Sequence, residues 1–368
     1  MADADRLAGD TRAALTTITE ALPAGEARPG QMEMAEAVAR AITDERHLVV
    51  QAGTGTGKTF AYLVPAVLAG RRVVVTTATK ALQDQLAEKD LPFLAEHLEE
   101  PVTWAVLKGR SNYVCLQRVR EVEGGEQLAL DVGPRPPTAE VAELVAWAGR
   151  TETGDRAELE REPSARSWAA VSVGPRECPG ASACPKGEQC FTEQARRAAA
   201  EAEIVVVNTH LYGLHLATGG AVLPEHDVVV VDEAHQLEDT IAATAGLEVT
   251  GGRFVAFART VGAIIDDREM VESIEALGDR WKVALADDLG RRLRRSLDGD
   301  AAVVRDLARN RLDLVMAALR GVADDGPGDV GARKQRAMKA ATTLIEDLDA
   351  IAEFRAGADF NQWRQRWH

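Results

Sequence analysis

The chain has 368 residues, 46% of them hydrophobic and 27% charged, which is the balance of a globular protein with room for two or three domains. Its net charge of −15 argues against a protein that coats nucleic acid with its whole surface, because phosphate contacts need lysine and arginine. No run of about 18 apolar residues is present, and the first residues lack the basic start and apolar core of a secretory signal. We therefore expect no membrane helix and a cytoplasmic location.

Short valine-rich runs alternate with helical patterns through much of the chain. A polar, alanine-rich start at 1–27 has one short helical pattern around 12–22. The elements expected after it are a helix over 32–42, a buried strand over 48–52, a helix over 58–68, a strand over 72–77, a long helix over 80–98, and strands over 103–107, 204–208 and 227–232. Near-continuous apolar strands separated by helices predict an α/β fold with a parallel sheet that is covered on both faces.

Two regions depart from this alternation. Residues 109–200 hold all four cysteines and a proline-rich patch, with helices expected over 139–147 and 191–202, which indicates an insertion. From 251 onward the pattern is helical and highly charged. The predicted organisation is an N-terminal extension, a sheet domain in two parts, an insertion between those parts and a helical region, with the boundaries 1–27, 28–108, 109–200, 201–250 and 251–368.

A glycine-rich loop separates the strand expected over 48–52 from the helix expected over 58–68, and it consists of Gly53, Thr54, Gly55, Thr56, Gly57, Lys58 and Thr59. Glycines let the backbone turn tightly and point its N–H groups inward, and the following helix adds the positive end of its dipole. Lys58 can reach the β- and γ-phosphates of a nucleotide, and the Thr59 hydroxyl can ligate Mg²⁺. The loop therefore predicts a nucleoside triphosphate site.

Two carboxylates follow the run of four valines that ends at residue 231. Asp232 can hold Mg²⁺, and Glu233 can polarise an attacking water as a general base. Because the carboxyl ends of parallel strands share one edge of a sheet, we expect both side chains to face the glycine-rich loop. His235 completes the run Asp-Glu-Ala-His.

The cysteines are Cys115 and, after 62 intervening residues, the group Cys178, Cys184 and Cys190. A reduced cytosolic chain favours a metal site over two disulfides. The spacing lacks the close pairs of zinc fingers and matches no ferredoxin pattern. Spacing alone leaves open an iron–sulfur site, a zinc site with four thiolates, and four unrelated free cysteines.

Together, the glycine-rich loop, the Asp-Glu-Ala-His run and the run Lys-Gly-Arg-Ser-Asn-Tyr-Val-Cys at 108–115 resemble the XPD/DinG family of superfamily 2 DNA helicases. The resemblance implies a RecA-like motor domain with an iron–sulfur insertion and a helical arch-like region. It implies ATP as the nucleotide, with Gln31 reading adenine, and a role for His235 in coupling the γ-phosphate site to a neighbouring domain. It also implies that Cys115, Cys178, Cys184 and Cys190 hold a [4Fe–4S] cluster.

Smaller signals carry two interpretations each. The run 76–80 resembles the family's contact with the DNA backbone, but Thr79 is equally suited to cap the helix that follows it. His210 lies in a segment that resembles the family, and a structural role is as consistent with its position. Beside Cys115, we expect Arg110 to pair with phosphate and Tyr113 to stack on a base.

The second motor domain of such helicases is not recognisable in the sequence. Neither a Ser-Ala-Thr motif nor a Gln-x-x-Gly-Arg-x-x-Arg motif follows His235. We expect the front half of an ATP-dependent helicase of the DNA-repair and replication-conflict type, moving 5′ to 3′ on single-stranded DNA. Its expected partners are single-stranded DNA and DNA junctions, and its expected state is a monomer. The alternatives are a non-catalytic ATP- and DNA-binding module and, less in keeping with the cysteines, an RNA helicase.

Overall fold

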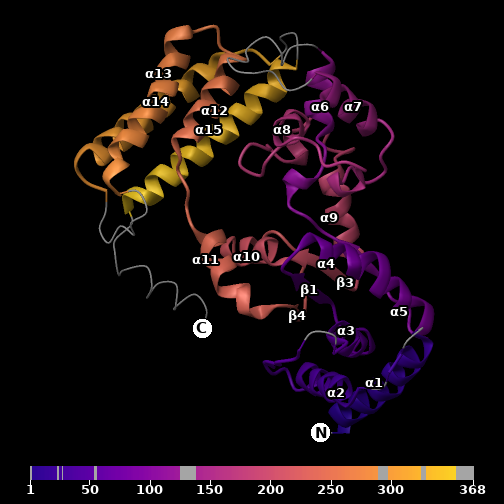
Figure 1. The fold of residues 1–368 in the computed structure, drawn as a ribbon. Coiled ribbons are helices and arrows are strands. Elements are labelled where there is room, and N and C mark those ends of the chain that lie inside the picture. Colours follow the sequence, from indigo (N-terminus) through magenta and orange to yellow (C-terminus); the bar gives the residue numbers. More distant parts are fainter. Residues whose placement is uncertain are drawn as a thin grey trace. The chain divides into compact units, whose positions relative to one another are not determined.

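The computed structural model describes residues 2–22, 25–26, 28–53, 56–124, 138–288, 297–324 and 329–353, which form two compact units (Figure 1). The first unit is drawn from Met1–Gly109 and Gln194–Gly246, and the second from Arg110–Glu193 and Leu247–His368. None of the helices in the described ranges has the length and apolar character needed to span a bilayer.

Four parallel strands form the sheet of the first unit, in the order β2-β3-β1-β4. Their bounds are β1 Val73–Thr77, β2 Trp104–Val106, β3 Ile204–Asn208 and β4 Val228–Val231. Val73 of β1 lies opposite Ile204 of β3 and opposite Val228 of β4. The parallel pairing confirms the α/β class predicted from the valine runs.

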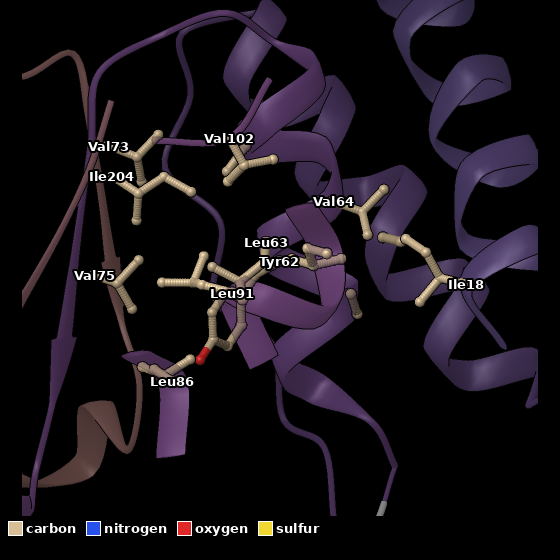
Figure 2. Close-up of a cluster of buried hydrophobic side chains, with 14 of the residues drawn as sticks. Ile18, Tyr62, Leu63, Val64, Val73, Val75, Leu86, Leu91, Val102 and Ile204 are labelled. Carbon is tan, nitrogen blue, oxygen red and sulfur yellow. The ribbon is translucent and has the colours of Figure 1, made fainter. Parts of the chain in front are cut away.

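The helices around this sheet are α1 Ala2–Ala21, α2 Pro29–Thr43, α3 Lys58–Leu68, α4 Lys80–Gln85, α5 Leu91–His97, α9 Phe191–Glu201, α10 Thr209–Ala217 and α11 Leu237–Ala245. Val73 and Val75 face one core, which contains side chains of α1, α2, α3 and α5 (Figure 2). Val74 and Val205 face the other core, with α9 and α10. Successive strand residues point to opposite faces, so helices on both sides bury the whole run.

Two helices differ in extent from their predictions. α1 begins ten residues before the pattern expected around 12–22, and its Leu15 and Ile18 are buried in the core. The helix expected over 80–98 is interrupted by a π-helical turn at Leu86–Asp90, after which α5 begins with a proline in its first turn. Proline has no N–H to donate to the preceding turn, which explains why the regular helix is broken there although its apolar residues stay buried.

The strand expected over 48–52 is wrong. Residues in this range form no strand, and Leu48, Val49 and Val50 are 42%, 94% and 40% exposed. A β-branched run becomes a strand only where another strand offers its backbone groups. Within the described residues, β4 ends the sheet, and the segment before the glycine-rich loop pairs with none of the four strands.

The second unit combines the cysteine-containing region with a helical bundle. The first part contains α6 Leu116–Glu123, α7 Thr138–Ala148 and α8 Ala165–Val171, and the second contains α12 Gly251–Gly262, α13 Arg268–Ala284, α14 Gly299–Gly321 and α15 Val330–Glu353. Consecutive bundle helices pack on one another, and α15 also packs on α12. Their shared core includes Phe254, Trp281 and Leu312, so the part of the chain after residue 251 is helical, as expected.

Candidate functional site

The glycine-rich loop leads directly into α3. Thr54 and Gly55 lie outside the described residues. The Thr56 hydroxyl donates to the Gly53 carbonyl at 2.9 Å, and Gly57 precedes α3 in the left-handed conformation, with φ of 76°. Lys58 and Thr59 are the first two residues of α3. The free N–H groups of this first turn therefore belong to the same short segment as the lysine, an arrangement that suits an anion.

Gln31 of α2 is attached to this loop. Its side-chain nitrogen donates to the Gly57 carbonyl at 2.9 Å, and the residue is 7% exposed. A Cβ at position 57 would lie 2.2 Å from that nitrogen, so the close approach and the positive φ both require glycine. In this structure the Gln31 amide holds the loop in place. Its role in reading adenine remains a prediction.

The two halves of the expected nucleotide site meet between Lys58 and Glu233. The Lys58 Nζ lies 3.4 Å from the Glu233 Oε1, although 175 positions separate the two residues. The other oxygen of Glu233 lies 3.4 Å from His235 Nδ1, and His235 is 68% exposed. The lysine of the loop and the acidic run after β4 therefore occupy one edge of the sheet.

The backbone after β4 makes an unusual turn. The Asp232 N–H donates to the Thr76 carbonyl of β1, and the Asp232 carboxylate accepts from the Glu233 N–H at 3.0 Å. Glu233 itself has φ of 55° and ψ of 46°, a left-handed conformation that costs a residue with a Cβ on the order of 1 kcal/mol. The turn brings the Glu233 side chain back towards Lys58.

Sequence reasoning missed Tyr62, which lies one turn after Thr59 on α3. Tyr62 is 2% exposed, and its hydroxyl makes no hydrogen bond that satisfies normal geometry within the described residues. Burial, and then the negative charge of Asp232, raise the pKa of the Tyr62 hydroxyl above its ordinary value. A buried hydroxyl beside Thr59 and Asp232 fits a site whose Mg²⁺ and water shell would complete its contacts. The only signal in the sequence is a tyrosine that stands among apolar residues in the helix expected over 58–68.

Two smaller expectations have structural counterparts. Thr79 caps α4, since its hydroxyl accepts from the Leu82 N–H at 3.3 Å. His210 Nδ1 lies 3.1 Å from the Thr244 hydroxyl of α11. The capping role of Thr79 is therefore observed, and contact of this segment with DNA remains a prediction.

All four cysteines line one pocket of the second unit. Cys115, Cys178, Cys184 and Cys190 are free thiols that line it together with Arg110 and Tyr113. Burial raises the pKa of Cys115 to about 11 and also raises that of Cys184. In the described ranges, no group of three or more His, Cys, Asp or Glu side chains is arranged to hold a metal ion.

Arg110 stands at the edge of this pocket. Its guanidinium donates to Glu193 Oε1 at 2.6 Å and lies 3.9 Å from the Cys190 sulfur. Tyr113 is only 4% exposed and lines the pocket from inside. A buried ring is not offered to a base, so the expected stacking role of Tyr113 is not supported by this structure.

A glycine-rich loop at a helix N-terminus, facing carboxylates at the end of a parallel strand, characterises phosphate-loop nucleotide-binding domains. Comparison with known proteins narrows this class. The model of the DEAD/DEAH box helicase family matches residues 29–123.

The chain is 41% identical over 290 residues to the ATP-dependent helicase DinG of Mycobacterium tuberculosis. The aligned region covers 74% of this chain and 44% of that protein. It is 38% identical over 251 residues to the ATP-dependent DNA helicase YoaA of Escherichia coli, covering 66% of this chain and 38% of that protein. The chain contains a DEAD/DEAH box helicase domain and is a homologue of the DinG and YoaA helicases. It spans less than half the length of these relatives.

A solved structure described as truncated XPD covers 86% of this chain and 81% of its own, at 11% identity and a TM-score of 0.42. A likeness at that score has no weight in the assignment.

Proposed function

We propose that this chain supplies the first motor domain of an ATP-dependent DNA helicase. The observation that carries the proposal is the contact of Lys58 with Glu233, which joins the glycine-rich loop to the Asp-Glu-Ala-His run. Homology to proteins named as ATP-dependent helicases supports the same function. We assign 28–108 and 201–250 to a RecA-like domain, 109–200 to an iron–sulfur insertion and 251–368 to an arch-like region.

Each residue at the sheet edge has a distinct task. The loop N–H groups and the Lys58 ammonium hold the phosphates of ATP, while Gln31 fixes the loop and reads the adenine. Glu233 accepts a proton from the attacking water, and its carboxylate contacts Lys58 through one oxygen and His235 through the other. His235 links this carboxylate to a neighbouring domain.

Thr59 and Asp232 are the residues that would hold Mg²⁺, which supplies positive charge to the β- and γ-phosphates when bound. The buried Tyr62 hydroxyl beside them fits this use.

We further propose that the four cysteines hold a [4Fe–4S] cluster. All four thiols line one shared pocket, which supports a single group bound by all of them, and the resemblance to the XPD/DinG family favours a cluster over a zinc ion. Protein purified without oxygen should be brown and contain about four iron atoms per chain. A colourless protein with one zinc per chain would refute the cluster.

Two binding measurements test the helicase function. We expect the 368-residue chain to bind a fluorescent ATP analogue with Mg²⁺, and to bind single-stranded DNA by anisotropy in preference to RNA of the same length. The matched variant Lys58→Ala should lose nucleotide binding and keep its circular dichroism spectrum. Equal nucleotide binding by both proteins would contradict the assignment of the loop, and preference for RNA would favour an RNA helicase.

Turnover separates a motor from a binding module. We expect the 368 residues by themselves, which span less than half the length of the DinG and YoaA relatives, to hydrolyse ATP below about 1 s⁻¹ even with DNA. DNA-stimulated turnover above that rate would refute this expectation. Nucleotide binding with no hydrolysis under any condition would favour the non-catalytic ATP- and DNA-binding module. Direction of movement, 5′ to 3′, and a monomeric state belong to the same proposal.

A further inference from the structure

α6 and α15 meet through buried charges. The Arg336 guanidinium donates to both oxygens of Glu121, at 2.6 and 2.5 Å, and the two side chains are 7% and 1% exposed. A charged side chain so deeply buried persists only with a partner, and the two-pronged geometry fixes the guanidinium in one orientation. The pair therefore holds α15 in a defined position on α6, across 215 positions of sequence.

α6 begins next to a candidate metal ligand. Cys115 is the residue that caps its N-terminus, and the Cys115 carbonyl accepts from the Val119 N–H at 2.9 Å. Arg118, on the same helix, lies 3.7 Å from Glu121, so two guanidiniums share this one carboxylate. α15 thus fixes the helix that begins directly after Cys115.

α15 also reaches the other cysteine-bearing segment. The Thr343 hydroxyl lies 3.4 Å from the carbonyl oxygen of Arg176, two residues before Cys178, and 3.0 Å from the Lys339 carbonyl of its own helix, which competes for the same proton. At the opposite end of the interface, Asp329 accepts from Gln117 at 3.2 Å and pairs with Arg120 at 2.9 Å, both on α6. One helix therefore contacts the segment that carries Cys115 and the segment that carries Cys178.

We propose that Arg336 is a positioning residue of the four-thiol site, and that α15 acts as a splint between its two cysteine-bearing segments. The two segments also meet directly, because the Cys115 N–H donates to the Val171 carbonyl at 2.8 Å and Val114 pairs with Ser172, so α15 adds a second connection between them. The inference rests on the proposed metal-binding role of the cysteines. It assigns the helical region a task, since removal of one arginine there would loosen a metal centre to which that arginine is not bonded.

Metal retention is the first measurement. Loss of a group that orients metal ligands from outside costs about 10–100-fold in metal affinity, so we expect Arg336→Ala to release iron to a chelator at least about tenfold faster than the unaltered chain. Arg336→Lys keeps the positive charge but cannot donate to both oxygens of Glu121 as the guanidinium does. This variant should retain more iron than Arg336→Ala, and should show more of the visible absorption of bound iron. Arg309→Ala is the matched control, because Arg309 lies on α14 and pairs with Asp313 of the same helix at 2.5 Å and with Asp349 of α15 at 3.1 Å.

Hydrogen exchange of the full 368-residue chain is the second measurement. Arg336→Ala should lose protection in α6 and in the segment 174–190, while the sheet of the first unit and the Arg309→Ala protein stay protected. Unchanged iron release and unchanged exchange in Arg336→Ala would overturn the inference. If the unaltered chain takes up neither iron nor zinc, the proposed cluster fails, and the exchange data still decide whether Arg336 holds the two segments.

Discussion

Replacement of Glu233 by glutamine should tighten nucleotide binding while it slows hydrolysis. In the structure, Lys58 is engaged by the Glu233 carboxylate at 3.4 Å, in the place where phosphates of a nucleotide need the ammonium group. Glutamine has nearly the same shape but no charge, so it competes less for Lys58 and repels phosphate less. The same change removes the proton acceptor for the attacking water.

The size of the effect follows from the exposure of the pair. In bulk water, unit charges 3.4 Å apart attract by about 1 kcal/mol, and exposed pairs are measured at about 0.2–1 kcal/mol. Lys58 and Glu233 are 27% and 36% exposed, so we take about 0.5–1 kcal/mol, which corresponds to roughly 2–5-fold tighter binding.

Titration of a fluorescent ATP analogue into the two proteins measures this difference, and a titration in raised salt is the internal control. The advantage of Glu233→Gln should shrink as salt screens the charges. Weaker nucleotide binding by Glu233→Gln, or an advantage that does not depend on salt, would refute the view that Glu233 and phosphate compete for Lys58.

Three further changes have expected outcomes. Gly57→Ala should weaken nucleotide binding at least about fivefold with an unchanged circular dichroism spectrum, because a side chain at φ of 76° costs about 1–3 kcal/mol. Leu312→Ala should destabilise the helical bundle by about 2–5 kcal/mol in urea, whereas Leu314→Ala on the same helix, at 57% exposure, should change little. Hydrogen bonds from the side chains of Ser167 and Ser164 lower the pKa of Glu140 to about 2, below its ordinary 4.5. The stability that this carboxylate contributes is therefore complete above about pH 4.5 and is lost as the pH falls towards 2, and Glu140→Gln should remove that dependence in an acid titration followed by tryptophan fluorescence.

The sequence predicted those elements whose signal is local. β1, β3 and β4 are runs of valine between helices, and the helix expected over 58–68 is observed as α3 with the same bounds. The meeting of Lys58 with Glu233 was also expected, because both follow from one rule about the carboxyl ends of parallel strands.

Other features depend on partners that no local pattern reveals. Residues 48–50 have the composition of a strand, but composition does not show whether another strand is within reach. The two-bond ion pair between Arg336 and Glu121 joins positions 215 apart, and in the sequence each residue resembles one of the many charged residues on helix surfaces. The break at Leu86–Asp90 could have been found from the proline that follows it.

The outer edge of β4 has a practical consequence for the isolated protein. β4 pairs with β1 on one side, and the described residues offer no strand to the backbone groups on its other side. On one face of this edge strand, Val229 is 39% exposed. The unpaired backbone groups of a valine-rich edge strand can pair with a strand of another copy of the chain. Natural sheets commonly prevent such pairing with charged side chains on the edge strand. We expect concentrated solutions of this chain to self-associate slowly through β4, and a lysine substituted at position 229 to delay the rise in light scattering. The sheet that brings the nucleotide site together is thus also expected to limit, through its open edge, the concentration at which this protein stays in solution.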